Sequence, residues 1–182
     1  MISPQESLKG AIKFFHTKAK GSPTLLNLEI TKLCNAKCDF CDYWQTRHEE
    51  RLYDYRPVIK QIDPLVVVVT GGEPMLRKDL PDIIRQIKEC SYFIFTSMVT
   101  KGDLLTVDKA QELFDAGINQ IAVSLDFPNK QHDTYRGIPG LWDKLSKLMP
   151  ELGKRFPDQK ITMNTIIMED NLEQVPELAR KA

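Results

Sequence analysis

Residues 65–74 read LVVVVTGGEP, and this stretch decides the class of fold. Four consecutive valines without polar alternation are typical of a strand that is covered on both faces, as in a parallel sheet packed between helices. The strand is expected over residues 65–70, and the Gly-Gly pair that follows ends it. The stretch therefore predicts an α/β protein with a parallel sheet.

The chain on both sides of residues 65–70 alternates short apolar runs with helical periods. Further strands are expected at residues 25–31, 92–99, 118–125 and 161–168. A helix is expected at residues 54–62, and a second one begins after an N-cap at Asp79. A third runs from an N-cap at Thr106 to a closing Gly117. A fourth contains the leucines at 141, 145, 148 and 152, and a fifth starts at Asn171. This spacing indicates right-handed βαβ units. About five such units predict a closed or nearly closed barrel, or a doubly wound sheet.

The first residues predict a basic amphipathic helix over residues 6–19. Leu8, Ala11, Ile12 and Phe15 recur at helical spacing, with lysines between them. We expect this apolar face to cap a core, and the alternative is a helix that lies on a membrane surface. A break at residues 21–23 divides the chain into an N-terminal helical extension, residues 1–22, and a core domain, residues 23–182.

Length and composition exclude several classes of protein. A chain of 182 residues with 42% hydrophobic residues is enough for one globular domain. The 25 basic residues balance the 25 acidic ones, so nothing indicates a nucleic-acid partner. The longest apolar run, residues 65–69, is far shorter than the roughly 20 residues of a membrane span. The start of the chain lacks the apolar core of a secretory signal, so we expect a cytoplasmic protein with reduced cysteines.

Three of the four cysteines crowd into residues 34–41, CNAKCDFC, directly after the first expected strand. Three thiolates in one short loop predict a shared ligand, because soft sulfur donors select zinc or iron–sulfur clusters. Zinc requires a fourth ligand, for which His48 is the nearby candidate. A cubane cluster held by Cys34, Cys38 and Cys41 leaves one iron open to a small molecule. The spacing favours the iron–sulfur cluster, and Cys90 is interpreted as a core residue.

The other polar and glycine-rich motifs follow the expected strands at their carboxyl ends. In parallel βα folds these ends share one face, where active sites are built. The motifs predicted to converge there are the cysteine loop, residues 71–74, residues 100–102, residues 124–126 and Asn164.

Taken together, these motifs resemble those of the radical S-adenosylmethionine (radical SAM) superfamily. CNAKCDFC is similar to its CxxxCxΦC run, and TGGEP to its glycine-rich motif after the second strand. SLD at residues 124–126 and HDTYRGIPG at 132–140 resemble the branch with the molybdenum-cofactor enzyme and the peptide-modifying maturases. The likeness runs from about residue 25 to residue 171. It implies a partial TIM-like barrel with five βα units of a six-unit core.

The resemblance also implies cofactors and their ligands. Cys34, Cys38 and Cys41 would bind a [4Fe-4S] cluster, and the amino and carboxylate groups of S-adenosylmethionine would chelate the fourth iron. The cofactor-binding residues implied are Phe40 at the adenine, Gly71, Gly72 and Glu73 at the methionine amino group, Ser124 at the ribose or carboxylate, and Arg136 at the carboxylate. Thr100 and Asn164 are the candidates for substrate contact. No catalytic side chain is assigned.

The implied activity is that of an enzyme that cleaves S-adenosylmethionine reductively. The 5′-deoxyadenosyl radical would abstract hydrogen from a substrate that the sequence does not identify, and flavodoxin or ferredoxin would supply the electron. Lys101 and Phe127 depart from the family's motifs, so substrate contacts on that side are expected to differ. The absent sixth unit leaves an open barrel edge as a candidate surface for self-association. The alternative is a catalytically incomplete scaffold fragment that holds a cluster or zinc.

Overall fold

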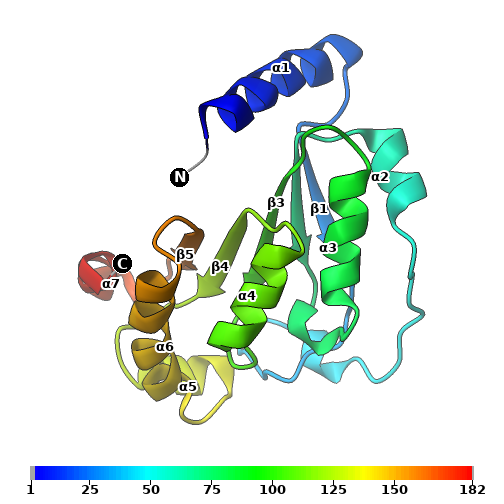
Figure 1. Ribbon diagram of the computed structural model, residues 1–182. Coiled ribbons are helices and arrows are strands. Elements are labelled where there is room, and N and C mark those ends of the chain that lie inside the picture. The colour runs from blue at the N-terminus through cyan, green and yellow to red at the C-terminus, as the bar shows by residue number, and fades with distance from the viewer. Residues whose placement is uncertain (1–2, 182) are drawn as a thin grey trace.

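Five parallel strands form one sheet in the order β1-β2-β3-β4-β5 in the computed structural model, which describes residues 3–181. Each strand is followed by helical structure, so the predicted partial TIM-like barrel is confirmed (Figure 1). Residues 1 and 2 of the predicted N-terminal extension and residue 182 of the predicted core domain lie outside the described residues. The strands are β1 Leu25–Glu29, β2 Val66–Thr70, β3 Phe95–Thr100, β4 Gln120–Ser124 and β5 Lys160–Asn164. The helices of the repeating units are α2 Arg56–Ile62, α3 Leu80–Glu89, α4 Val107–Asp115, α6 Leu141–Arg155 and α7 Val175–Lys181.

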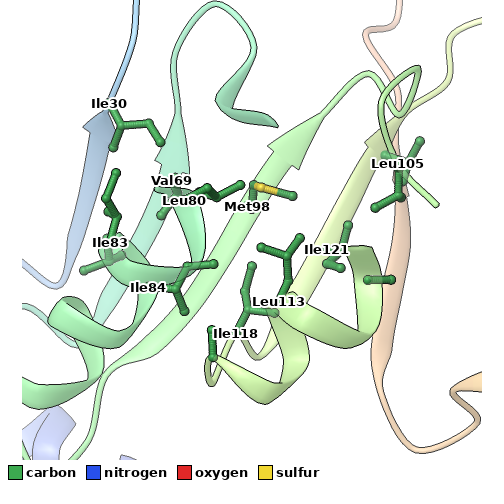
Figure 2. Packing of buried hydrophobic residues seen from close by; sticks show 14 of the residues in the cluster. Ile30, Val69, Leu80, Ile83, Ile84, Met98, Leu105, Leu113, Ile118 and Ile121 are labelled. Carbon is green, nitrogen blue, oxygen red and sulfur yellow. The ribbon is translucent and has the colours of Figure 1, made fainter. Parts of the chain in front are cut away.

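The hydrophobic core lies between the sheet and the layer formed by α3, α4 and α6. Val69, Met98 and Ile121 on neighbouring strands are fully buried against Ile84 of α3 and Leu113 of α4 (Figure 2). Burying each such side chain stabilises the fold by about 1.5–3 kcal/mol. This helix layer fixes the sheet, and the carboxyl ends of the strands are thereby held in register.

The predicted double coverage of β2 is only partly correct. Val67 and Val69 are fully buried, whereas Val66 and Val68 on the opposite face are only partly buried. That second face points into the interior of the barrel, which five strands leave open. The valine run thus correctly indicated a parallel strand, but the alternation of burial follows the strand period of two.

Several boundaries and caps differ from the sequence predictions. The strand predicted over 161–168 ends at Asn164, and a short helix, α5 Gln131–Arg136, was not predicted. Asp79 occupies the N-cap position of α3 as expected, but its carboxylate binds the Arg77 side chain and makes no capping hydrogen bond. Thr106 does cap α4, since its Oγ1 accepts a hydrogen bond from the Lys109 N–H at 3.2 Å.

The first helix, α1 Pro4–Lys20, forms as predicted but packs with the opposite face. Its buried residues are Lys13 and Thr17, while Leu8, Ile12 and Phe15 are exposed, so the predicted core-capping face is wrong. The physical reason is an ion pair between Lys13 and Asp63, which holds the polar face against the body of the protein. No helix within residues 3–181 combines the length and apolarity needed to cross a bilayer.

Candidate cofactor site

One cavity of about 210 Å³ at the carboxyl ends of the strands is lined by all eleven residues that the resemblance assigned to the cluster, to S-adenosylmethionine or to the substrate. They are Cys34, Cys38, Phe40, Cys41, Gly71, Gly72, Glu73, Thr100, Ser124, Arg136 and Asn164. A larger hollow of about 650 Å³ lies beside β5, between α6 and α7, and it is mainly apolar. We place the site in the smaller cavity, because only there do thiols, a carboxylate and two cationic side chains converge.

The cysteine loop follows β1 and is held by contacts to the backbone of Arg136, at the end of α5. The Lys37 N–H donates a hydrogen bond to the Arg136 carbonyl at 3.1 Å, and the Cys38 sulfur lies 3.9 Å from the same oxygen. Cys38 is buried, whereas Cys34 and Cys41 are half-buried, and all four cysteines are free thiols. Burial raises the pKa of the Cys38 thiol, and the nearby Arg136 cation opposes part of that rise.

The two glycines after β2 are required by close contact with the backbone that leads into Cys34. A Cβ on Gly71 would lie 2.2 Å from the Thr31 carbonyl oxygen, and one on Gly72 would lie 2.3 Å from that of Leu33. Gly71 also has a φ of +147°, which side chains disfavour. The N–H groups of Gly72 and Glu73 donate to those two carbonyls at 2.8 and 2.9 Å. The glycine motif therefore docks directly onto the cysteine loop.

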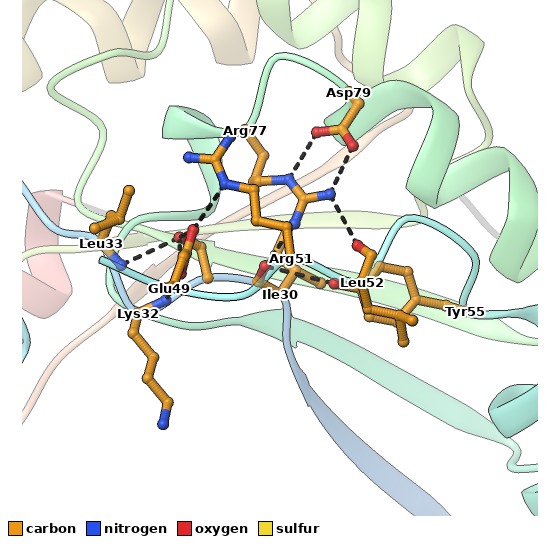
Figure 3. A network of polar contacts seen from close by, with 10 residues as sticks. Ile30, Lys32, Leu33, Glu49, Arg51, Leu52, Tyr55, Arg77 and Asp79 are labelled. Atoms are coloured by element: carbon orange, nitrogen blue, oxygen red, sulfur yellow. Dashed lines mark hydrogen bonds and ion pairs between the residues drawn. The ribbon is translucent and has the colours of Figure 1, made fainter. Parts of the chain in front are cut away.

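A polar network that sequence analysis missed anchors the segment between β1 and the cysteines. The fully buried Arg77 donates to the carbonyls of Ile30 at 2.9 Å and Leu52 at 3.1 Å, and it pairs with Asp79 (Figure 3). Glu49 accepts hydrogen bonds from the Thr31 hydroxyl and the Lys32 N–H. The network ties residues 30–32 to the long loop that follows the cysteines.

The Glu49 carboxylate is the acceptor centre of this network. Burial by itself would raise the pKa of Glu49, but the hydrogen bonds from Lys32, Thr31 and Arg51 together hold it below the ordinary value. Arg51 is a neighbour of Glu49 in sequence, whereas Thr31 and Lys32 precede it by 18 and 17 residues and follow no motif. Only the fold brings those two to Glu49.

Lys101 also belongs to the site, although the motifs did not identify it as functional. Its Nζ lies 3.1 Å from Glu73 Oε2, 3.7 Å from the Cys34 sulfur and 3.6 Å from Asp103. The Thr100 hydroxyl donates to the other Glu73 oxygen at 2.7 Å. Lys101 is thus a buried cation between the glycine motif and a cysteine, at the position where the sequence departs from the family pattern.

Arg136 is buried and bound to a carboxylate within the protein. Its Nε lies 2.8 Å from Oδ2 of Asp126, which is fully buried, and its guanidinium lies 5.3 Å from the centre of the Phe40 ring. Phe40 stacks on Tyr135 with ring centres 5.2 Å apart. The arginine therefore links β4, the short helix α5 and the cysteine loop at one wall of the cavity.

His132 and Asp133 organise the segment that carries Arg136, as their pattern indicated. Asp133 accepts hydrogen bonds from the N–H groups of Gly140 and Trp142, which fixes the turn after α5. His132 Nδ1 accepts from the Asp126 N–H at 3.3 Å. Burial, and secondly the Arg136 cation, lowers the pKa of His132 to about 4, so the ring is neutral and its proximity to the Asp126 carboxylate is no ion pair at neutral pH.

The donor set fits an iron–sulfur cluster better than a single metal ion. Within the described residues, no three His, Cys, Asp or Glu side chains converge on one ion position. His48 lies in a different hollow, beside Glu49 and Tyr55, and so does not join the cysteines as a zinc ligand. Three thiol ligands that are spread around one cavity fit a cluster, whose irons are bound separately.

The fold and the site together define a partial βα-barrel enzyme core with a cysteine-rich cofactor loop. The family model of the Radical SAM superfamily matches residues 28–182. The chain belongs to the radical SAM superfamily, and the resemblance seen in its motifs is confirmed.

Curated relatives match much of the chain, and a solved structure shares its fold. An AdoMet-dependent heme synthase of Oleidesulfovibrio alaskensis is 28% identical over 90% of this chain and 44% of its own length. A probable GTP 3′,8-cyclase of Archaeoglobus fulgidus is 37% identical over 64% of this chain and 40% of its own length. The fold of Streptococcus suis SuiB, solved with the precursor peptide SuiA, matches 98% of this chain and 42% of that chain, with a TM-score of 0.72 and 21% identity. The chain thus spans less than half the length of these relatives.

Proposed function

We propose that Cys34, Cys38 and Cys41 hold a [4Fe-4S] cluster and that S-adenosylmethionine binds beside it in the same cavity. The observation that carries this proposal is the convergence of the three cysteines with Gly71–Glu73 around one cavity of about 210 Å³. When bound, a cluster at these cysteines would supply the one electron needed for reductive cleavage of the sulfonium S–C5′ bond, and the 5′-deoxyadenosyl radical formed would serve to abstract hydrogen from the substrate.

The protein's own residues orient the cofactors. Gly72 and Glu73 hold the cysteine loop in place, because their N–H groups donate to the carbonyls of Thr31 and Leu33. Phe40, stacked on Tyr135, offers an aromatic surface to an adenine ring. Ser124 and Arg136 supply a hydroxyl and a cation to the polar end of the ligand, with Arg136 oriented by Asp126.

Contacts to the substrate are proposed for Thr100 and Asn164, at the ends of β3 and β5. The relatives are named for heme synthesis and for GTP cyclisation, so their names do not point to one class of substrate. We therefore assign the reductive cleavage and leave the substrate class to experiment. A flavodoxin or ferredoxin is proposed as the electron donor.

The test is an anaerobic assay of the reconstituted chain. Protein is loaded with iron and sulfide, reduced with dithionite and mixed with S-adenosylmethionine, and 5′-deoxyadenosine and methionine are measured by mass spectrometry. Both products are expected from the unmodified chain. Cys38→Ala is expected to abolish them, because the cluster loses one of its three protein ligands.

Cys90→Ala is the matched control, since Cys90 lies at the end of α3, away from the cavity. It is expected to retain the cluster absorbance and product formation. Equal loss in both variants would contradict the ligand assignment. A cluster without 5′-deoxyadenosine would favour the incomplete scaffold, and bound zinc without iron or sulfide would replace the cluster by a zinc site.

A further inference from the structure

The apolar face of α1 is directed to solvent. Leu8, Ile12 and Phe15 are spaced at i, i+4 and i+7, so they share one side of the helix. Their exposed fractions are 62%, 54% and 71%. Single exposed apolar residues are common on protein surfaces, but a contiguous stripe that includes an aromatic ring marks an interaction surface.

The helix cannot turn this face inward, because its opposite face is fixed to the protein. The Lys13 side chain is fully buried, pairs with Asp63 and donates to the Ser91 hydroxyl at 2.9 Å. Gly10 lies against the Phe93 ring, where a Cβ would approach to 3.0 Å. Rotation of α1 would separate the buried Lys13 from its partners, which is strongly unfavourable.

Cations border the exposed stripe on both sides. At 100° per residue, Lys18 lies on one side of Leu8, Ile12 and Phe15, and Lys9 lies on the other, next to Lys20. The helix carries four lysines and a single acidic residue, Glu6, whose carboxylate is engaged by Ser3 in the capping box. Lys13 is buried on Asp63, and Lys20 lies 3.6 Å from the same carboxylate, so Lys9 and Lys18 are the cations that border the stripe without this acidic partner. The full chain has a formal net charge of zero, so this positive charge is a local property of α1.

We infer that α1 docks the protein on an anionic lipid bilayer. In this arrangement Leu8, Ile12 and Phe15 enter the boundary between headgroups and acyl chains, and the flanking lysines contact lipid phosphates. A second copy of the chain is the poorer partner for this face. A two-fold contact would bring the two lysine borders together and oppose like charges.

The position of α1 leaves the cofactor cavity accessible on a bound protein. Asp63 and Ser91, which hold α1, precede β2 and β3, so the helix lies at the amino ends of the strands (Figure 1). The cavity lies at the carboxyl ends, on the other end of the sheet. Docking through α1 therefore places the cavity away from the bilayer. The docking inference does not depend on the function proposed above.

The test is cosedimentation of the chain with vesicles. We expect binding to vesicles rich in phosphatidylglycerol, much weaker binding to pure phosphatidylcholine, and weakening by salt. The double variant I12D/F15D is expected to lose binding. The variant K9Q/K18Q is expected to bind about 25-fold more weakly, from about 5-fold for each lysine near an anionic surface.

Matched controls separate this surface from general effects of charge and folding. I167D/L172D changes two equally exposed apolar residues elsewhere, and K147Q/K154Q removes two exposed lysines of α6. Both controls should bind like the unmodified chain, and circular dichroism should show equal helix content in all variants. Absence of binding to anionic vesicles at low salt overturns the inference. The inference is also overturned if the chain forms a dimer without lipid and I12D/F15D dissociates that dimer, because the exposed face of α1 would then bind a second copy of the chain.

Discussion

At the scale of single residues, Lys101 gives the sharpest electrostatic prediction. Its ammonium lies 3.7 Å from the Cys34 sulfur, where a positive charge favours the reduced, more negative form of a bound cluster. Lys101→Met is expected to lower the reduction potential of the proposed cluster by up to about 200 mV, from Coulomb's law at the 3.7 Å separation and an effective dielectric constant near 20. Potentiometric titration followed by electron paramagnetic resonance measures the shift.

Lys101→Arg is the control, because it keeps the charge in the cavity. It should leave the potential close to that of the unmodified protein. Lys101→Met also leaves the buried Glu73 without its cation, so a loss of stability is expected in addition. An unchanged potential in Lys101→Met would show that the lysine serves only to neutralise Glu73.

Gly71 provides a stability prediction at the same scale. Gly71→Ala places a Cβ 2.2 Å from the Thr31 oxygen at a φ of +147°, so we expect a loss of about 3 kcal/mol or more in unfolding free energy. Gly153→Ala in α6 is the matched control, since no atom lies within 4 Å of its Cβ. It should stabilise the helix by about 0.5–1 kcal/mol. Urea unfolding of both variants tests the contrast, and equal effects would contradict it.

Residues that belong to short motifs were predictable, whereas their partners were not. The cysteines, Glu73 and Arg136 stand in recognisable patterns, and the structure brings them to one cavity as expected. Glu49 carries no local pattern, because its importance comes from burial beside groups that are distant in sequence. Asp126 stands in the SLD motif, but its role in orienting Arg136 could not be predicted from that motif. The docking of the glycine motif onto the cysteine loop, through the N–H groups of Gly72 and Glu73, was not indicated by the sequence either.

At the scale of elements, the network around Arg77 joins β1, the loop after the cysteines and α3. Arg77→Met removes the guanidinium donor from the carbonyls of Ile30 and Leu52 and leaves Asp79 without its cation, so we expect a loss of about 2–4 kcal/mol in stability. Hydrogen exchange in residues 49–55 should accelerate at the same time. Arg85→Met on α3, which removes an exposed ion pair with Asp82, should change stability by less than about 1 kcal/mol. Similar exchange in the two variants would contradict the anchoring role.

The order and type of the main elements followed from sequence periodicity, but faces and ends did not. Strong apolar runs such as residues 65–70 mark buried strands, so the sequence located the strands to within a few residues. The six-residue α5 has no apolar period to announce it. The face of α1 was mispredicted because the Lys13–Asp63 ion pair outweighs the exposure of three apolar side chains, and no local pattern predicts that pairing.

At the scale of the whole molecule, the buried His132 couples folding to pH. Its pKa is about 4 in the folded protein and 6.5 as the ordinary value, because burial disfavours the charged ring. As pH falls below 6.5, the unfolded chain takes up a proton that the folded chain does not. Stability therefore decreases as pH falls from 6.5 to 4, and the loss levels off below pH 4, where both states are protonated. Its full size is at most about 3 kcal/mol.

His132→Gln removes this proton uptake, so the stability of that variant should change less between pH 6.5 and 4 than that of the unmodified chain. The variant's stability at pH 7 is expected to be lower, because the glutamine must replace the acceptor for the Asp126 N–H. Urea unfolding at a series of pH values measures the slope. His16→Gln is the control, since His16 is exposed on α1 and its replacement should leave the slope unchanged. If His132→Gln kept the full slope between pH 6.5 and 4, the prediction would be wrong, because carboxylates with a lowered pKa such as Glu49 lose their stabilisation mainly at more acidic pH and cannot supply that slope.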